Sequence, residues 1–324
     1  MNQIHLSANQ FVIEASAAES IAESLNLPSV LHLLPHLVHS AQALARPPIS
    51  NFNVGAVGLG SDGRVFVGVN LEFPGLPLHH SVHAEQFLLT NLAVHRCRRL
   101  LSFAVSSAPC GHCRQFLQEL RHSSSVQILV IDEENCAQNI DHVENRKPLS
   151  KFLPNPFGPH DLLDHECPLL LDQHDNRLDL LPPNTVNSVN LSNGNDENFS
   201  KLANGNCGKY EKSEDLLRES ALEAANNAHA PYSGCPSGVA LMDSEGNVYK
   251  GSYTESAAYN PSLGPVQAAL IAYVASGGGG YESIVAAALV EKEGAKVRQE
   301  DTARLVLKAV SPKCDFRVFY CHSG

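Results

Sequence analysis

Two short segments of the sequence contain residue types that bind metal ions and move protons. Cys110 and Cys113 are three residues apart at the expected start of a helix, so both sulfur atoms lie on one face of it. His83 comes directly before a second expected helix and is the simplest third ligand. Two thiolates and one imidazole supply three ligands of a tetrahedral zinc and leave the fourth position to water. Glu85 lies about 200° from His83 around an ideal helix, so it is free to move protons beside that water.

Two other roles are common for a Cys-x-x-Cys pair: half of a structural zinc site, and a redox-active dithiol. The nine cysteines of the sequence include no second pair at this spacing, so a four-cysteine zinc site cannot close. A redox pair would leave His83 and Glu85 without a role. The four residues together therefore favour a catalytic zinc centre.

The surrounding sequence predicts the elements that must position these residues. Short apolar runs joined by Ser61-Asp62-Gly63 indicate a hairpin, and helices and strands then alternate. In chain order we expect helices at 15–25 and 29–45, strands at 54–60 and 64–69, a helix at 84–94, a strand at 101–107, a helix at 111–121 and a strand at 126–131. This order predicts an α/β fold with a mixed sheet.

The second half of the chain repeats the first at a constant offset. Four residues of the hairpin region recur 183 positions later, namely Gly55, Gly63, Gly68 and Glu72 as Gly238, Gly246, Gly251 and Glu255. A match of this length at one offset indicates two copies of one fold. We therefore expect an N-terminal helical segment at 1–48, a catalytic domain at 49–150, a connecting segment at 151–210 with an asparagine-rich linker at 184–206, and a degenerate domain at 211–324.

The second copy has no counterpart of the metal-binding residues. The same offset places Val266 at the position of His83 and Ala268 at that of Glu85. The two cysteines fall on Glu293 and Lys296, or on Gly294 and Val297 if one more residue is added. Either alignment removes all four chemical groups. We therefore expect one zinc ion per chain.

Composition excludes several classes of function. The sequence contains 34 acidic and 23 basic residues, for a formal net charge of −11, and such a surface repels nucleic-acid backbones. No apolar stretch is long enough to cross a bilayer, and the first residues do not resemble a secretory signal. We therefore expect a cytoplasmic protein that binds neither nucleic acid nor membrane.

Five ordered segments resemble the cytidine deaminases, in particular the class that carries two copies of the fold and forms homodimers. These segments are Phe52-Asn53-Val54-Gly55-Ala56, Asn70-Leu71-Glu72-Phe73, His83-Ala84-Glu85-Gln86, Pro109-Cys110-Gly111-His112-Cys113-Arg114-Gln115-Phe116 and Phe157-Gly158-Pro159-His160-Asp161-Leu162. The resemblance implies a duplicated three-layer α-β-α fold whose second copy lacks the metal site. It also implies a homodimer.

The resemblance further implies a role for each matching residue. His83, Cys110 and Cys113 would bind Zn²⁺, and Glu85 would be the proton shuttle. The substrate contacts would be Phe52 on the pyrimidine ring, Asn70, Leu71 and Glu72 around the ribose, and Phe157 closing the pocket, from its own chain or across the dimer interface. The implied reaction is hydrolysis of the exocyclic C–N bond of cytidine and deoxycytidine, which yields uridine or deoxyuridine and ammonia in pyrimidine salvage.

Two alternatives to a nucleoside hydrolase remain open from the sequence. An enzyme that acts on cytosine in RNA or DNA would need a basic groove, and the only dense basic run is Arg96, Arg98 and Arg99. An inactive, zinc-binding dimeric scaffold would fit the loss of the site in the second copy. However, all four chemical residues of the first copy are present.

Overall fold

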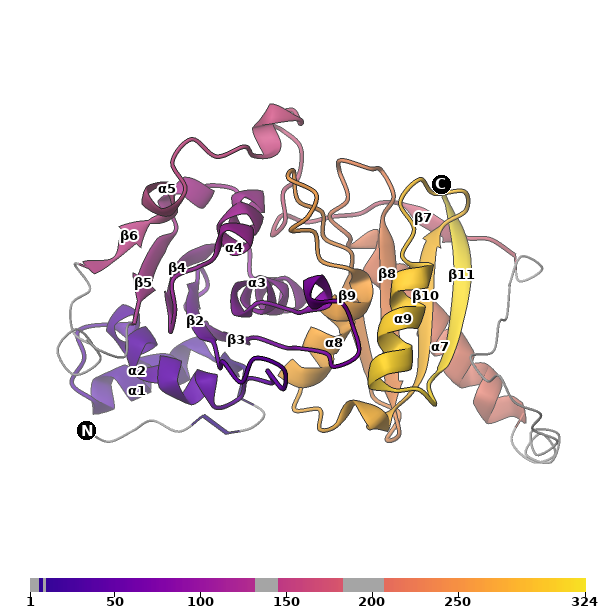
Figure 1. Ribbon diagram of the computed structural model, residues 1–324, viewed down its shortest axis with the longest axis horizontal. Coiled ribbons are helices and arrows are strands. Elements are labelled where there is room, and N and C mark those ends of the chain that lie inside the picture. Colours follow the sequence, from indigo (N-terminus) through magenta and orange to yellow (C-terminus); the bar gives the residue numbers. More distant parts are fainter. Residues whose placement is uncertain (1–5, 8–9, 132–144, 183–206) are drawn as a thin grey trace. The chain divides into compact units, whose positions relative to one another are not determined.

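The computed structural model describes residues 6–7, 10–131, 145–182 and 207–324 (Figure 1). The asparagine-rich stretch at 184–206 thus lies outside the described residues. The chain divides into two compact units. The first comprises Met1–Gln173, Glu255–Leu263 and Val274–Gly278, and the second comprises His174–Thr254, Gly264–Tyr273 and Gly279–Gly324.

The first unit is built on a mixed sheet with the strand order β1-β3-β2-β4-β5-β6. Its strands are β1 (Val12–Ile13), β2 (Gly55–Gly60), β3 (Val65–Val69), β4 (Leu100–Val105), β5 (Gln127–Val130) and β6 (Lys147–Pro148). Its helices are α1 (Ala15–Ser24), α2 (Val30–Gln42), α3 (Ala84–Val94), α4 (Gly111–Phe116) and α5 (Leu149–Phe152). β4 and β5 are parallel, and the other neighbouring strands are antiparallel.

The surroundings of two strand glycines show that α2 and α3 pack on opposite faces of this sheet. A Cβ on Gly55 would lie 2.6 Å from the backbone nitrogen of Gln42 in α2, whereas a Cβ on Gly58 would lie 3.1 Å from the Leu88 side chain in α3. Side chains alternate between the faces of a strand, so positions 55 and 58 point in opposite directions. The first unit is therefore a three-layer α-β-α structure, as expected.

Helix α2 contains a proline beyond its first turn, and the structure compensates for it. Pro35 has no N–H to give to the Leu31 carbonyl, which would be its helical acceptor. Arg146 supplies the missing donor, because its Nη2 donates to the Leu31 oxygen at 2.7 Å. The Nη1 of Arg146 donates to Ser102 Oγ, also at 2.7 Å, which ties α2 to strand β4.

The second unit repeats the same core, with the strand order β7-β11-β10-β8-β9. Its strands are β7 (Leu178–Leu180), β8 (Ser237–Asp243), β9 (Val248–Ser252), β10 (Ile284–Lys292) and β11 (Asp315–Ser323). Its helices are α7 (Cys207–Asn226), α8 (Pro265–Ala275) and α9 (Glu300–Val310). Strand β7, from the segment expected only to connect the domains, pairs with the edge of β11.

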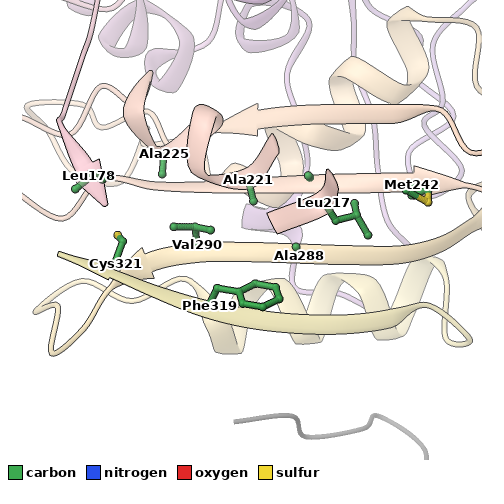
Figure 2. Close-up of a cluster of buried hydrophobic side chains, with 10 residues drawn as sticks. Leu178, Leu217, Ala221, Ala225, Met242, Ala288, Val290, Phe319 and Cys321 are labelled. Carbon is green, nitrogen blue, oxygen red and sulfur yellow. The ribbon is translucent and has the colours of Figure 1, made fainter. Parts of the chain in front are cut away.

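Helix α7 covers one face of the second sheet through residues one turn apart. Leu217, Ala221 and Ala225 of α7 face the buried side chains of the strands (Figure 2). Those strand residues are Leu178, Ala240, Met242, Ala288, Val290, Phe319 and Cys321. Small residues on α7 allow close packing, since a Cβ on Gly238 would lie 2.4 Å from the Ala221 carbonyl oxygen. The spacing of four residues is that of an amphipathic helix.

The structure corrects the alignment of the two copies at the chemical positions. A Cβ on Gly68 would meet the Ala84 oxygen and Leu88 nitrogen of α3, and a Cβ on Gly251 would meet the Pro265 oxygen and Ala269 nitrogen of α8. Ala84 therefore corresponds to Pro265, at an offset of 181 rather than 183. The loop before α8 is two residues shorter than the loop before α3, a difference that the strand match does not reveal.

The counterparts of the metal-site residues change accordingly. His83 corresponds to Gly264 and Glu85 to Val266, so the expected pairs with Val266 and Ala268 were wrong by two residues. Strand pairing gives an offset of 184 in the next strand, because Val57 faces Ala104 and its counterpart Ala240 faces Ala288. This is the offset that gives Gly294 and Val297 for the two cysteines. The helix that follows starts at Gly111 in the first copy and at Glu300 in the second, so the loop between has a different length and the strand register assigns neither cysteine a counterpart. The conclusion is unchanged, because Gly264 and Val266 carry no metal-binding side chain and the one metal-binding group among the described residues lies in the first copy.

Most of the other expected elements are present with small shifts. The helix expected at 111–121 is shorter, since α4 ends at Phe116 and a 3₁₀ turn at Leu117–Glu119 follows it. Within the described residues, no helix combines the length and the apolar character that crossing a membrane would require.

Candidate functional site

Three side chains from two helix starts meet in the first unit. His83 is the N-cap residue of α3, Cys110 is the N-cap residue of α4, and Cys113 lies in the first turn of α4. His83 Nδ1 lies 3.5 Å from Cys110 Sγ and 3.3 Å from Cys113 Sγ, and the two sulfur atoms are 3.7 Å apart. Among the residues that the structure describes, these three form the one group of metal-binding type.

These separations fit a tetrahedral zinc ion. Zn–S bonds of about 2.3 Å and Zn–N bonds of about 2.0–2.1 Å give tetrahedral edges of about 3.8 Å between sulfurs and about 3.5 Å between sulfur and nitrogen. The observed distances agree with both values to within about 0.2 Å. Little movement would therefore be needed to bind the ion, and one position would remain open.

Protonation within the cluster also fits a cation site. The pKa of Cys110 is lowered to about 3 by its hydrogen-bonding contacts with Cys113 and His83, which outweigh the effect of burial. The pKa of Cys113 is raised by its hydrogen bond to Cys110 and by burial, and that of His83 is raised by Cys110. A divalent cation would displace the protons on these groups, because metal binding requires thiolates and a neutral imidazole.

Glu85 lies beside the cluster and is shielded from solvent. Its side chain is 4% exposed, and its Oε2 accepts a hydrogen bond from Cys113 Sγ at 3.1 Å. Burial raises the pKa of this carboxyl, although the hydrogen bond from Cys113 and the charge of His83 act in the opposite direction. A carboxyl that readily holds a proton next to an open metal position is suited to proton transfer.

The expected substrate contacts on the β3 side form one connected structure. Asn70 Oδ1 accepts a hydrogen bond from the Val54 nitrogen, and Asn70 Nδ2 donates to the Phe52 oxygen, both at 2.9 Å. Phe52 is 57% exposed, so its ring is available to a ligand. Glu72 accepts hydrogen bonds from the turn that precedes Phe52. These bonds lower the pKa of Glu72 despite its partial burial, and the carboxylate stays ionised.

Leu71 differs from its neighbours because its side chain is fully buried. Only its backbone could contact a ligand. That backbone instead pairs with Val82, through hydrogen bonds of 2.9 and 2.8 Å in the two directions. The pairing joins the segment of Asn70 and Glu72 to the residue that precedes His83.

Phe157 is half exposed and is attached to the helix of the cysteines. Its side chain is 48% exposed, and its carbonyl oxygen accepts a hydrogen bond from Gln115 Nε2 at 2.6 Å. His112, which stands between the two cysteines, stacks its ring on that of His83 at a centroid distance of 4.9 Å.

Two buried polar residues near the site were missed from the sequence. Gln86 Oε1 accepts a hydrogen bond from the His83 nitrogen at 3.2 Å, and Gln86 Nε2 donates to the Pro261 oxygen at 3.0 Å. Glu119 is fully buried and accepts a hydrogen bond from the Ala257 nitrogen at 2.7 Å. The segment Glu255–Leu263 is therefore part of the first unit. Gln86 recurs as Gln267 at the corrected offset, a signal that the offset of 183 concealed.

Comparison with known proteins agrees with this geometry. Two models of the cytidine and deoxycytidylate deaminase zinc-binding region match the chain, at residues 29–129 and 149–304. Cytidine deaminase 1 of Arabidopsis thaliana is 55% identical over 97% of this chain and 98% of its own length. Cytidine deaminase 6 of the same plant is 46% identical over 94% of this chain and 96% of its own length.

One solved structure is similar to part of this chain. The crystal structure of cytidine deaminase from Mycobacterium tuberculosis is 32% identical over 39% of this chain and 96% of that chain, with a TM-score of 0.33. The family match, with the full-length relatives and the His-Cys-Cys cluster, establishes zinc as the cofactor, with one ion per chain. The chain belongs to the zinc-dependent cytidine and deoxycytidylate deaminase family, in the class that carries two copies of the deaminase fold.

Proposed function

We propose that the protein hydrolyses cytidine and deoxycytidine to uridine and deoxyuridine, with release of ammonia. The observation that carries this proposal is the cluster of His83, Cys110 and Cys113 at tetrahedral separations, with the buried Glu85 carboxyl beside it. Relatives named cytidine deaminase, similar over nearly the whole chain, support the same reaction.

Each group of the cluster has a defined task in this proposal. His83 Nδ1 and the two thiolates would hold zinc, which when bound lowers the pKa of a water molecule in the fourth position. Glu85 takes a proton from the attacking water. It passes that proton to the ring nitrogen next to the amino-bearing carbon. It then takes a second proton from the hydroxyl added to that carbon and gives it to the amine, which leaves as ammonia while the hydroxyl becomes the carbonyl of the product.

The neighbouring residues would hold the nucleoside. Phe52 offers an exposed ring face to the pyrimidine, and Phe157 closes the pocket, in its own chain or across a dimer interface. Asn70 and Glu72 face the sugar, and Leu71 between them supports the pair through its backbone pairing with Val82. Because Glu72 stays ionised, it accepts hydrogen bonds from sugar hydroxyls and repels a nearby phosphate. This charge favours a nucleoside over a nucleotide.

We also propose a homodimer that works in pyrimidine salvage in the cytoplasm. Large apolar side chains are exposed on the first unit, among them Leu78 at 71%, and a second copy could cover them. The cysteines that the structure describes are all free, which fits a reducing compartment. The expected domain limits (1–48, 49–150, 151–210 and 211–324) remain part of the proposal.

The two alternatives raised by the sequence are not favoured. A polynucleotide substrate conflicts with the net charge of −11, and the full-length relatives are named for cytidine. An inactive scaffold would not need a proton-carrying Glu85 beside an open metal position.

A direct assay tests the proposed reaction. Purified protein is mixed with cytidine, and the loss of the cytosine ultraviolet band is followed with and without a strong zinc chelator. We expect conversion to uridine that the chelator abolishes, and metal analysis should give one zinc per chain. Folded, zinc-loaded protein that leaves cytidine unchanged would disprove the nucleoside assignment.

A further inference from the structure

A tight turn precedes Phe52 and holds the residues that face the substrate. The Asn51 nitrogen donates to the Pro47 oxygen at 2.9 Å, and Asn51 adopts a left-handed backbone with φ of 55°. Asparagine tolerates this conformation better than most residues do. The turn directs the chain from Ser50 back toward Phe52.

The Ser50 hydroxyl connects two of the proposed substrate contacts. Ser50 Oγ donates a hydrogen bond to Glu72 Oε1 at 2.5 Å and accepts one from the Phe52 nitrogen at 3.1 Å. One hydroxyl therefore fixes both the carboxylate that faces the sugar and the backbone of the residue that faces the ring.

The two carboxylate oxygens of Glu72 accept different numbers of hydrogen bonds. Oε2 accepts hydrogen bonds from the nitrogens of Ile49 at 2.8 Å and Ser50 at 2.9 Å, whereas Oε1 accepts the one from Ser50 Oγ. A carboxylate offers about four acceptor positions, about two on each oxygen. The position that remains for a sugar hydroxyl is therefore on Oε1, the oxygen that Ser50 orients.

We propose that Ser50 is a positioning residue, which orients Glu72 Oε1 toward a hydroxyl of the sugar. The inference rests on the proposed function, because it concerns binding of the nucleoside at that site. Ser50 acts through Glu72, so its contribution depends on a sugar hydroxyl that donates to the carboxylate.

The second copy offers a matched control. Gly234 has φ of 65°, its nitrogen donates to the Ala230 oxygen at 3.1 Å, and Ser233 Oγ accepts a hydrogen bond from the Cys235 nitrogen at 3.0 Å. The same turn with the same serine thus exists where the metal site is absent. A Ser233→Ala variant measures what loss of the turn hydroxyl does to the fold alone.

The test compares Ser50→Ala, Ser50→Thr and Ser233→Ala in the full-length, zinc-loaded protein. Each variant is assayed for kcat and KM with cytidine, and for the inhibition constant of 2′,3′-dideoxycytidine, which lacks both sugar hydroxyls next to Glu72. Zinc content and thermal stability are measured alongside.

We expect Ser50→Ala to raise KM for cytidine about tenfold, the effect of one charge-assisted hydrogen bond, with kcat unchanged. The inhibition constant of the dideoxynucleoside for Ser50→Ala should equal that of the wild type. Ser50→Thr keeps a hydroxyl, so its KM for cytidine should be close to the wild-type value. Ser233→Ala should bind both ligands as the wild type does. Equal losses for both ligands, a fall in kcat, or the same rise in KM from Ser233→Ala would overturn the inference while leaving the reaction intact. Wild-type protein without turnover would instead overturn the proposed function, and this inference with it.

Discussion

Replacement of Glu85 by glutamine separates proton transfer from metal binding. The amide has the shape of the carboxyl and can accept the hydrogen bond from Cys113, but it cannot carry a proton to the substrate. Loss of a general acid–base group lowers the rate by about 10²- to 10⁴-fold. This corresponds to about 2.7–5.4 kcal/mol of transition-state stabilisation. The zinc ligands are untouched, so the metal content should stay at one ion per chain.

For the same substitution we expect no loss of stability. The side chain of Glu85 is 4% exposed, and burial already favours its neutral form. A neutral amide has no ionised form that resists burial. The free energy of unfolding should therefore stay constant or rise while turnover falls.

Three measurements on Glu85→Gln check this reasoning together: steady-state turnover of cytidine, zinc content and a denaturation curve. Turnover within about tenfold of the wild type would refute a proton-transfer role, because the loss would fall below the range for acid–base catalysis. Parallel loss of zinc and activity would show instead that Glu85 holds the metal site together.

Three further predictions concern the support of the site. Cys110→Ala should remove zinc from the chain and abolish turnover, since one of three protein ligands is lost; metal analysis of the folded variant checks this. Gly68→Ala should destabilise the protein by about 1–3 kcal/mol and weaken zinc binding, because its Cβ would lie 2.3 Å from the Ala84 oxygen at the start of α3. Gly251→Ala should lower the free energy of unfolding by a similar amount but leave zinc binding intact. Denaturation curves and metal titrations of the Gly68→Ala and Gly251→Ala variants test this difference. Gln86→Ala should lower zinc affinity by about 10–100-fold, because the backbone of His83 loses its acceptor, whereas Gln267→Ala should not; competition with a chelator measures both.

Local patterns in the sequence were enough to predict the fold class and the cofactor. The alternation of apolar runs, turns and helix starts reflects short-range physics, and the α/β fold with a mixed sheet and the zinc are both confirmed, as is the three-layer arrangement that the family resemblance implied. His83 and Cys110 are each the N-cap residue of a helix in the first unit, and their side chains meet at 3.5 Å.

Contacts between distant segments could not be read from local patterns. Helix α4 ends early, at Phe116, and Glu119 then takes hydrogen bonds from the backbone nitrogens of Ala257 and Leu170. Neither partner is near in sequence. The error of two residues at α8 has a similar origin, since the strands keep their register while the loop that follows changes length.

The duplication separates what the fold requires from what the chemistry requires within one chain. Three features occur in both copies. Gly68 and Gly251 each lie close to a helix backbone, Asn51 and Gly234 each adopt a left-handed backbone, and Gln86 and Gln267 are the same residue type. His83 and Glu85 have the counterparts Gly264 and Val266, which offer no metal ligand and no acid–base group. Where the first copy has Asn70, the second has Tyr253, which lies in a small apolar cluster and is only 7% exposed. The second copy has thus kept the turn, the close helix contact and the buried glutamine, whereas, within the part of the chain that the structure describes, the side chains that would bind zinc and move protons occur only in the first.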